Sequence, residues 1–316
     1  MALITTSTMT AAVQNTLASR MLSMDTPDLI HNIPTIREKL PKHGGKQLTF
    51  ERYSRLAPAM VPLAGGATPP SSNLEAIRIN CIPQLYGSWI SMNEQVPIQS
   101  QSKPLNQAAR VLGMQLRETE DALTRNMMAS TAAHVNCVGG TSADTPTEMS
   151  LSDFNNITSA LMGANARKML DGIEGKDKFG TAPVKNSYML LGHTDLSGDF
   201  MGTTGFTNVA NYPDQKNIAS SEWGTIASLR VFLSSVGSKE IATSANGNDV
   251  YNMICLGLEA VGIVDQDGLG AQVVYTDPSI AGGPLWQNAT LAWKTSFVSQ
   301  ILNESWIIRG RCTLRP

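Results

Sequence analysis

Two short stretches carry residue types that bind phosphate or calcium in other proteins, and each lacks the spacing that such binding needs. Gly44-Gly45-Lys46 is similar to the end of a phosphate-binding loop, but Gln47 follows the lysine where that motif has Ser or Thr. Residues 265–268, Asp-Gln-Asp-Gly, lack the third spaced oxygen ligand and the closing glutamate of a calcium loop. We therefore predict a turn at 265–268 and no phosphate site at 44–46.

A third stretch, GHTDLSGD, places His193 two residues before Asp195. Members of a catalytic triad converge from segments that are distant in the sequence, so this spacing is more typical of a turn. The sequence contains no GxSxG or HExxH motif, and its four histidines are dispersed. We expect no catalytic residue, no cofactor and no metal site, and therefore a protein that is not an enzyme.

The cysteines and the N-terminal residues indicate in which cellular compartment the protein is found. The four cysteines are far apart and form no CxxC pair: Cys81, Cys137, Cys255 and Cys312. We predict buried free thiols in a reducing compartment. The first twenty residues lack the basic start and the long apolar core of a secretion signal. No run approaches the roughly 18 apolar residues of a membrane helix, so we expect no membrane association.

Composition narrows the class of protein. The 316 residues are enough for two hydrophobic cores. A net charge of −2 and an isoelectric point near 6.1 argue against a dedicated nucleic-acid binder, which should be basic. Charged residues make up only 16% of the chain, below the usual quarter. Such a sparsely charged surface suggests coverage by partners.

The stretch RLAPAMVPLAGGATPP, residues 55–70, is apolar and broken by proline and glycine. Proline excludes a helix interior and a central strand. Irregular backbone also excludes a membrane span. Two interpretations stay open: a loop folded under its own core, or a loop whose apolar tip is buried against another chain.

The flanking residues predict that this stretch is the tip of a hairpin. Residues 47–56 have the composition of a strand, and residues 75–82 alternate apolar with polar side chains. A hairpin turn needs only two to five residues, so a connection this long is normally functional or disordered. Ahead of the hairpin, residues 1–45 read as an arm interrupted by prolines, with a short helix around 11–24.

A long helix is predicted at 103–131. Pro104 suits a first helical turn. At about 1.5 Å per residue the helix would be roughly 40 Å long. Its apolar stripe at helical spacing consists of Leu105, Ala108, Leu112, Leu116, Leu123 and Met127.

The rest of the chain predicts mixed elements. A capping box at Ser150 and Asp153 begins a second helix that should end near 171–172. Short strands are expected at 188–191, 226–233 and 251–258, and a closing β-hairpin at 288–302 and 305–315. The last strand places three basic side chains on one face, where they meet acidic neighbours or face packaged DNA: Arg309, Arg311 and Arg315.

The order of these pieces resembles the major capsid proteins of tailed bacteriophages, which have the Hong Kong 97 fold. Within that class the chain is similar to the family typified by coliphage N-four. The resemblance spans about residues 45–303 and is carried by YSRLAPAMVPLAGGATPP, LNQAARVLGMQLRETEDALTRNMM, YMLLGHTDL and GGPLWQNATLAWKTSFVSQIL, among others. Thr194 departs from the family, because relatives often have proline at that point.

The resemblance implies an α+β fold with five parts. These are an N-terminal arm (1–45), an extended β-hairpin loop (46–102), a spine helix with peripheral domain (103–150), a mainly axial domain (151–269) and the return strands of the peripheral domain (270–316). The hairpin tip would contact a neighbouring subunit, and the helical stripe would pack on the closing strands. The expected contact residues at the tip are Leu56, Met60, Val61, Leu63, Gly65 and Gly66.

The resemblance also implies a function. The chain would assemble with itself, through pentamers and hexamers, into an icosahedral head around double-stranded DNA, within the host bacterial cytoplasm. It implies procapsid maturation, a portal and a separate scaffolding protein, with a decoration protein as a further candidate partner. The tip has no lysine, so no covalent cross-link is expected. Alternatives are an encapsulin-like shell, a tail-tube or other virion protein, and a hydrolase with an unmarked site.

Overall fold

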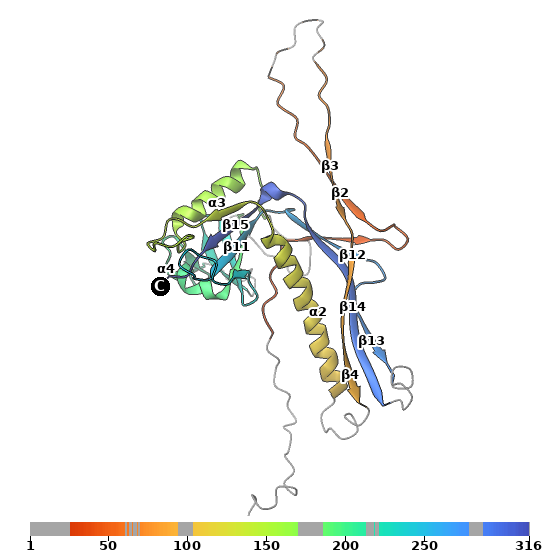
Figure 1. Cartoon of the computed structure of the whole chain (residues 1–316). Helices are drawn as coiled ribbons and strands as arrows, with labels where there is room; N and C mark the ends of the chain where they lie inside the picture. The colour runs from red at the N-terminus through yellow and green to blue at the C-terminus, as the bar shows by residue number, and fades with distance from the viewer. Residues whose placement is uncertain are drawn as a thin grey trace, which may run out of the picture. The chain divides into compact units, whose positions relative to one another are not determined.

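The computed structural model describes residues 26–60, 62, 65, 68, 70–93, 104–169, 186–212, 218, 221–277 and 287–315. Figure 1 shows how the helices and strands follow one another. In this part of the chain the helices are α2 (Pro104–Ala129), α3 (Leu151–Gly163) and α4 (Ser197–Gly202), and the 3-10 turns are η1 (Thr194–Leu196), η2 (Val209–Asn211) and η4 (Glu304–Trp306). The strands are β1 (Ile36–Leu40), β2 (Leu48–Tyr53), β3 (Ala76–Cys81), β4 (Gln84–Asn93), β5 (His134–Asn136), β6 (Tyr188–His193), β7 (Thr207–Asn208), β8 (Glu222–Ile226), β9 (Leu229–Ser234), β10 (Lys239–Glu240), β11 (Val250–Leu256), β12 (Val261–Gln266), β13 (Gln272–Thr276), β14 (Asn288–Ile301) and β15 (Ile307–Cys312).

These strands form three sheets. The largest has the order β5-β15-β11-β6-β9-β8-β7, with β10 paired to β11. A second has the order β1-β12-β14-β13, with β4 also paired to β14, and the third is the hairpin of β2 and β3. Helices and mixed sheets in one chain confirm the predicted α+β class.

Two compact units divide the chain. The smaller unit includes Ser88–Gln115 and Val273–Trp293. The larger unit consists of Pro27–Gly87, Leu116–Gln272 and Lys294–Pro316. Both α2 and β14 contribute residues to each unit.

The larger unit buries the largest sheet on both faces. Along β6, Tyr188 and Leu190 point into one hydrophobic cluster, and Met189 and Leu191 point into another. This follows from the period of two in a strand. Strand β11 is buried along its whole length, as expected of a strand covered on both sides.

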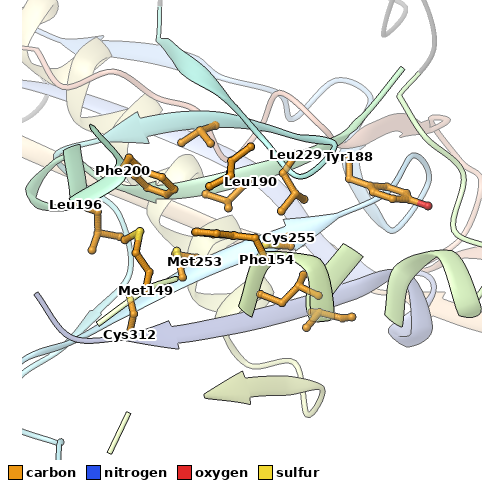
Figure 2. Close-up of a cluster of buried hydrophobic side chains, with 14 of the residues drawn as sticks. Met149, Phe154, Tyr188, Leu190, Leu196, Phe200, Leu229, Met253, Cys255 and Cys312 are labelled. Carbon is orange, nitrogen blue, oxygen red and sulfur yellow. The ribbon is translucent and has the colours of Figure 1, made fainter. Parts of the chain in front are cut away.

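Helix α3 covers one of these faces. Its capping box at Ser150 and Asp153 is present, which confirms that prediction. Figure 2 shows Phe154 of α3 against Leu190, Met253 and Cys255 of the sheet. All four cysteines are free and buried, and burial raises the pKa of the Cys255 thiol well above its usual range.

The predicted closing hairpin is wrong. Both strands exist, but β14 pairs with β12, β13 and β4, whereas β15 pairs with β11 and β5. Between them Asn303 accepts a hydrogen bond from the Ser305 amide, 3.3 Å, and begins the 3-10 turn η4. That turn sends the chain from one sheet into another.

Residues 226–233 are also not one strand. Strand β8 ends at Ile226, and β9 begins at Leu229. Ala227 and Ser228 between them have φ values of 46° and 65°. Two successive positive φ values make the tight turn of an antiparallel hairpin, and β8 and β9 pair in that way.

The second helix ends earlier than predicted. Helix α3 stops at Gly163, before the expected end at 171–172, which lies outside the described residues. The Ala164 amide donates to the Ala160 carbonyl, 3.0 Å, and Asn165 adopts a left-handed φ of 53°. A left-handed residue cannot continue a right-handed helix. The helix expected at 11–24 lies outside the described residues as well.

Candidate subunit-contact surfaces

The predicted hairpin is present as β2 and β3. Their antiparallel register runs from Leu48 opposite Cys81 to Tyr53 opposite Ala76. One bond further, the Ser54 amide donates to the Glu75 carbonyl at 2.9 Å. The strands thus stay paired up to the start of the apolar stretch at 55–70.

The base of this hairpin is anchored in the larger unit. A small buried cluster joins Leu40, Cys81 and Val264. Leu48, Phe50 and Ile79 from the two hairpin strands pack against it. These contacts fix the root of the hairpin by burying apolar side chains from both of its strands.

Beyond the base, large apolar side chains are exposed. Met60 is 85% exposed, Leu74 66%, Tyr53 60% and Leu56 49%. Gly65 is exposed too, whereas the predicted contact residues Val61, Leu63 and Gly66 lie outside the described residues. For the described part of the stretch, burial under its own core does not hold, and the alternative of burial against another chain gains support.

A second exposed apolar surface lies in the smaller unit, on the two strands that flank β14. On β4, Trp89 is 64% exposed. On β13, Val273 is 54% and Tyr275 50% exposed. On β14 between them, Leu291 and Trp293 are buried. Sequence reasoning missed this surface, because β13 reads as a short isolated apolar run.

Helix α2 supplies the backing of that sheet. Trp293 of β14 donates its indole N–H to Gln115 of α2, at 2.9 Å. Ala108 and Leu112 on the predicted stripe are buried. Of the other stripe residues, Leu116 is buried in the larger unit, Leu123 and Met127 are half-buried, and the side chain of Leu105 lies outside the described set.

The three C-terminal arginines lie close to acidic residues. Arg309 and Arg311 both reach Glu240 of β10, with N–O distances of 3.3 and 2.8 Å. Burial would raise the pKa of Glu240, but hydrogen bonds from Asn252 and Arg311 outweigh it and lower that pKa. The Arg315 amide donates to Asp199, 3.0 Å, and its side chain is exposed. Arg309 and Arg311 thus have an acidic neighbour in Glu240, and Arg315 has one in Asp199.

The pair His193 and Asp195 belongs to a polar cluster. The Asp195 amide donates to His193 Nδ1, 3.1 Å, which confirms a local turn. The Tyr251 hydroxyl donates to Asp195, 2.8 Å, and Lys239 lies 2.8 Å from Asp249. The hydrogen bond between Lys239 and Asp249 raises the pKa of Lys239, and burial raises the pKa of Tyr251. Both groups therefore keep their protons at neutral pH and serve the local structure.

The described residues show no other centre for chemistry. Among them, no group of three or more His, Cys, Asp or Glu side chains could hold a metal ion. Gly268 has a φ of +86° in the turn after β12, so a turn is present at 267–268, whereas residues 265 and 266 of the predicted turn still belong to β12. Within the same residues, no helix is long and apolar enough to cross a membrane.

Comparison with known sequences finds no match, neither to a family model nor to a curated protein. Comparison with solved structures is different. The chain is similar to the capsid of Ralstonia phage GP4 with a TM-score of 0.71 and 12% identity, over 96% of each chain. It is similar to the capsid of cyanophage P-SCSP1u with a TM-score of 0.67 and 13% identity, over 96% of this chain and 94% of that one.

A third similar structure is the head of Helicobacter pylori bacteriophage KHP40. Its TM-score is 0.66 at 8% identity, over 100% of this chain and 98% of that one. At such low identity the likeness establishes the fold. The chain has the fold of phage capsid proteins, which is the Hong Kong 97-type fold predicted from its sequence.

Proposed function

We propose that this chain is the major capsid protein of a tailed bacteriophage. It would assemble through pentamers and hexamers into an icosahedral head that encloses double-stranded DNA. The observation that carries this proposal is the hairpin of β2 and β3, whose anchored base leads to exposed Leu56 and Met60. In a chain with this fold, that exposed surface is best explained by a neighbouring copy.

The energetics suit a shell. Burying a side chain the size of Leu56 or Met60 contributes at most about 1.5–3 kcal/mol. Association and ordering costs cancel much of that gain, so each contact is weak and reversible. Reversibility lets a growing shell correct errors, and repetition over many copies supplies the final stability.

The proposed partners follow from this role. A separate scaffolding protein and a portal would act during assembly in the host bacterial cytoplasm, before procapsid maturation, and a decoration protein is a further candidate. DNA in the finished virion would be contacted without sequence preference. Arg309, Arg311 and Arg315 remain the proposed basic contacts with DNA, although Glu240 offsets two of them.

An encapsulin-like shell is not favoured, because the similar solved structures are phage capsids and heads. The two kinds of shell differ in cargo: shells from infected cells should contain DNA, and an encapsulin-like shell should contain an enzyme. A hydrolase has less support, since the polar side chains around Asp195 are engaged with one another.

The hairpin proposal predicts that charge at the tip blocks assembly. Leu56→Asp with Met60→Asp should leave the subunit folded, because both side chains are exposed. The double variant should form shells at least about tenfold less efficiently, because burying two carboxylates is costly. Sedimentation and electron microscopy measure the shell yield, and circular dichroism checks the fold.

The matched control is Ser71→Asp with Ser72→Asp. It adds the same charge at exposed polar positions of the same connection. Shell formation by the Leu56 and Met60 variant at the level of this control would show that the tip does not lie in a subunit contact.

A further inference from the structure

We propose that Asp121 is a latch that holds the strap, residues 28–35, against helix α2. Asp121 lies in the half of α2 that belongs to the larger unit, as the strap does. The latch is a local device, which opens without unfolding the rest of that unit. It rests on the hydrogen bonds of Asp121 with His31 and Asn32 and does not depend on the proposed function.

Within the described part of the chain, the Asp121 carboxylate forms its hydrogen bonds with the strap. Its Oδ1 accepts the backbone N–H of His31 at 2.9 Å and that of Asn32 at 3.3 Å. Its Oδ2 lies 2.6 Å from His31 Nδ1. A carboxylate only accepts, so the imidazole donates this bond.

Because both side chains are buried, the loss of these hydrogen bonds would be energetically costly. Asp121 is 0% and His31 1% exposed. A buried carboxylate is tolerated only when it is paired and hydrogen-bonded. Removing one partner leaves the other desolvated and unpaired, which costs more than the bond itself contributes. Asp121 therefore favours the closed strap strongly over any open one.

Two apolar side chains also attach the strap. Ile30 is buried in the cluster that includes Met128 of α2, and Ile33 packs against the same cluster. The Ser234 hydroxyl donates to the Asp28 carbonyl. Beyond the strap, β1 is the end strand of its sheet, where among the described strands it pairs only with β12, and its last residue, Leu40, belongs to the buried cluster at the root of the hairpin. The strap itself, residues 28–35, forms no strand, so an opening confined to these residues would break no strand pairing and leave the root of the hairpin in place.

Sequence alone does not indicate this latch. His31 and Asp121 are 90 residues apart, and the spacing along the helix predicts instead that Asp121 pairs with Arg117 and Arg125. Its burial appears only when the strap covers that position of α2.

Hydrogen exchange read by mass spectrometry tests the latch on the full chain. In Asp121→Ala the amides of His31 and Asn32 lose their acceptor. Exchange across residues 28–35 should become at least about tenfold faster, because hydrogen bonds to charged groups are among the stronger ones. Exchange of β11 and α3 should stay unchanged, and that difference separates a local latch from general destabilisation.

Asp153→Ala is the matched control. Asp153 is another buried carboxylate that accepts backbone N–H groups, from Val138 at 3.1 Å and Ser150 at 3.1 Å. Its loss should speed exchange around 138–150 and leave the strap protected. If Asp121→Ala does not fold, Asp121→Asn keeps one acceptor oxygen and should speed strap exchange by a smaller factor, again locally.

Two results would overturn the latch. One is strap protection that survives in the Asp121 variants. The other is acceleration of the same factor in the strap, β11 and α3, which would mean that Asp121 supports the whole unit and no separate opening exists.

Discussion

Glu148 illustrates, at the scale of a residue, how this chain uses buried carboxylates to hold loops. Burial alone would raise its pKa, but hydrogen bonds from Ser142 and Thr141 outweigh that effect and hold the pKa well below its usual range. The Ser142 amide lies 2.9 Å from Oε1, and the Thr141 hydroxyl 2.5 Å. Space beside it is so tight that a Cβ on Gly140 would lie 2.4 Å from the Glu148 carboxyl carbon.

Glu148→Gln should destabilise the fold by about 2 kcal/mol at pH 7, because bonds to a charged acceptor become bonds to a neutral amide. The pKa of Glu148 is lower when folded than its ordinary 4.5. Its contribution is therefore complete above pH 4.5 and disappears as the pH falls toward the folded value. Urea unfolding at pH 7, 5, 4 and 3 should show the gap between wild type and variant closing below pH 4.5.

Glu38→Gln, at an exposed position of β1, is the control and should leave the unfolding free energy within about 0.5 kcal/mol at every pH. A gap for Glu148→Gln that is as large at pH 3 as at pH 7 would contradict a role for the charge.

At the scale of elements, helix α2 and β14 hold the smaller unit together through buried side chains. Leu112→Ala should lower the free energy of unfolding by about 2–5 kcal/mol, because Leu112 is only 3% exposed and its removal leaves a cavity. Val111→Ala, at a neighbouring position 51% exposed, should be neutral or slightly stabilising, because alanine is the better helix former. Thermal unfolding measures both, and equal losses would refute the assigned face of α2.

Sequence reasoning worked best for elements whose signal is local. Spaced leucines predict α2, and alternation predicts the hairpin of β2 and β3, since each pattern depends on neighbours in the chain. The prediction of a closing hairpin was wrong because a local pattern does not show which strands pair. Alternation identifies β14 and β15 as strands, but a five-residue connection with no diagnostic turn cannot reveal that they join different sheets. Pairing depends on contacts that are distant in sequence.

The same limit applies to the candidate contact surfaces, of which one part can be predicted from local sequence and another part cannot. Leu56 and Met60 were predictable because an apolar stretch with prolines is unusual by itself. Trp89 and Tyr275 were not, because their exposure depends on how β4 and β13 flank β14. The ion pairs of Arg309 and Arg311 with Glu240 likewise require the pairing of β11 with β10 and β15.

At the scale of the whole molecule, the fold, the sparse charge and the exposed apolar side chains agree. Only 16% of residues are charged, and large apolar side chains are exposed in both compact units. A chain with two such surfaces can join copies head to tail, and rotation then closes them into rings. The five parts expected from the family resemblance, from the arm at 1–45 to the return strands at 270–316, stay a prediction.

The measurement that tests the central proposal most directly is electron microscopy of the purified chain with sedimentation alongside, repeated after addition of lysate from infected cells to supply scaffold. The proposal predicts closed shells, or rings of five and six copies, in at least one of the two conditions. A compact monomer of 33.9 kDa that persists in both would contradict it.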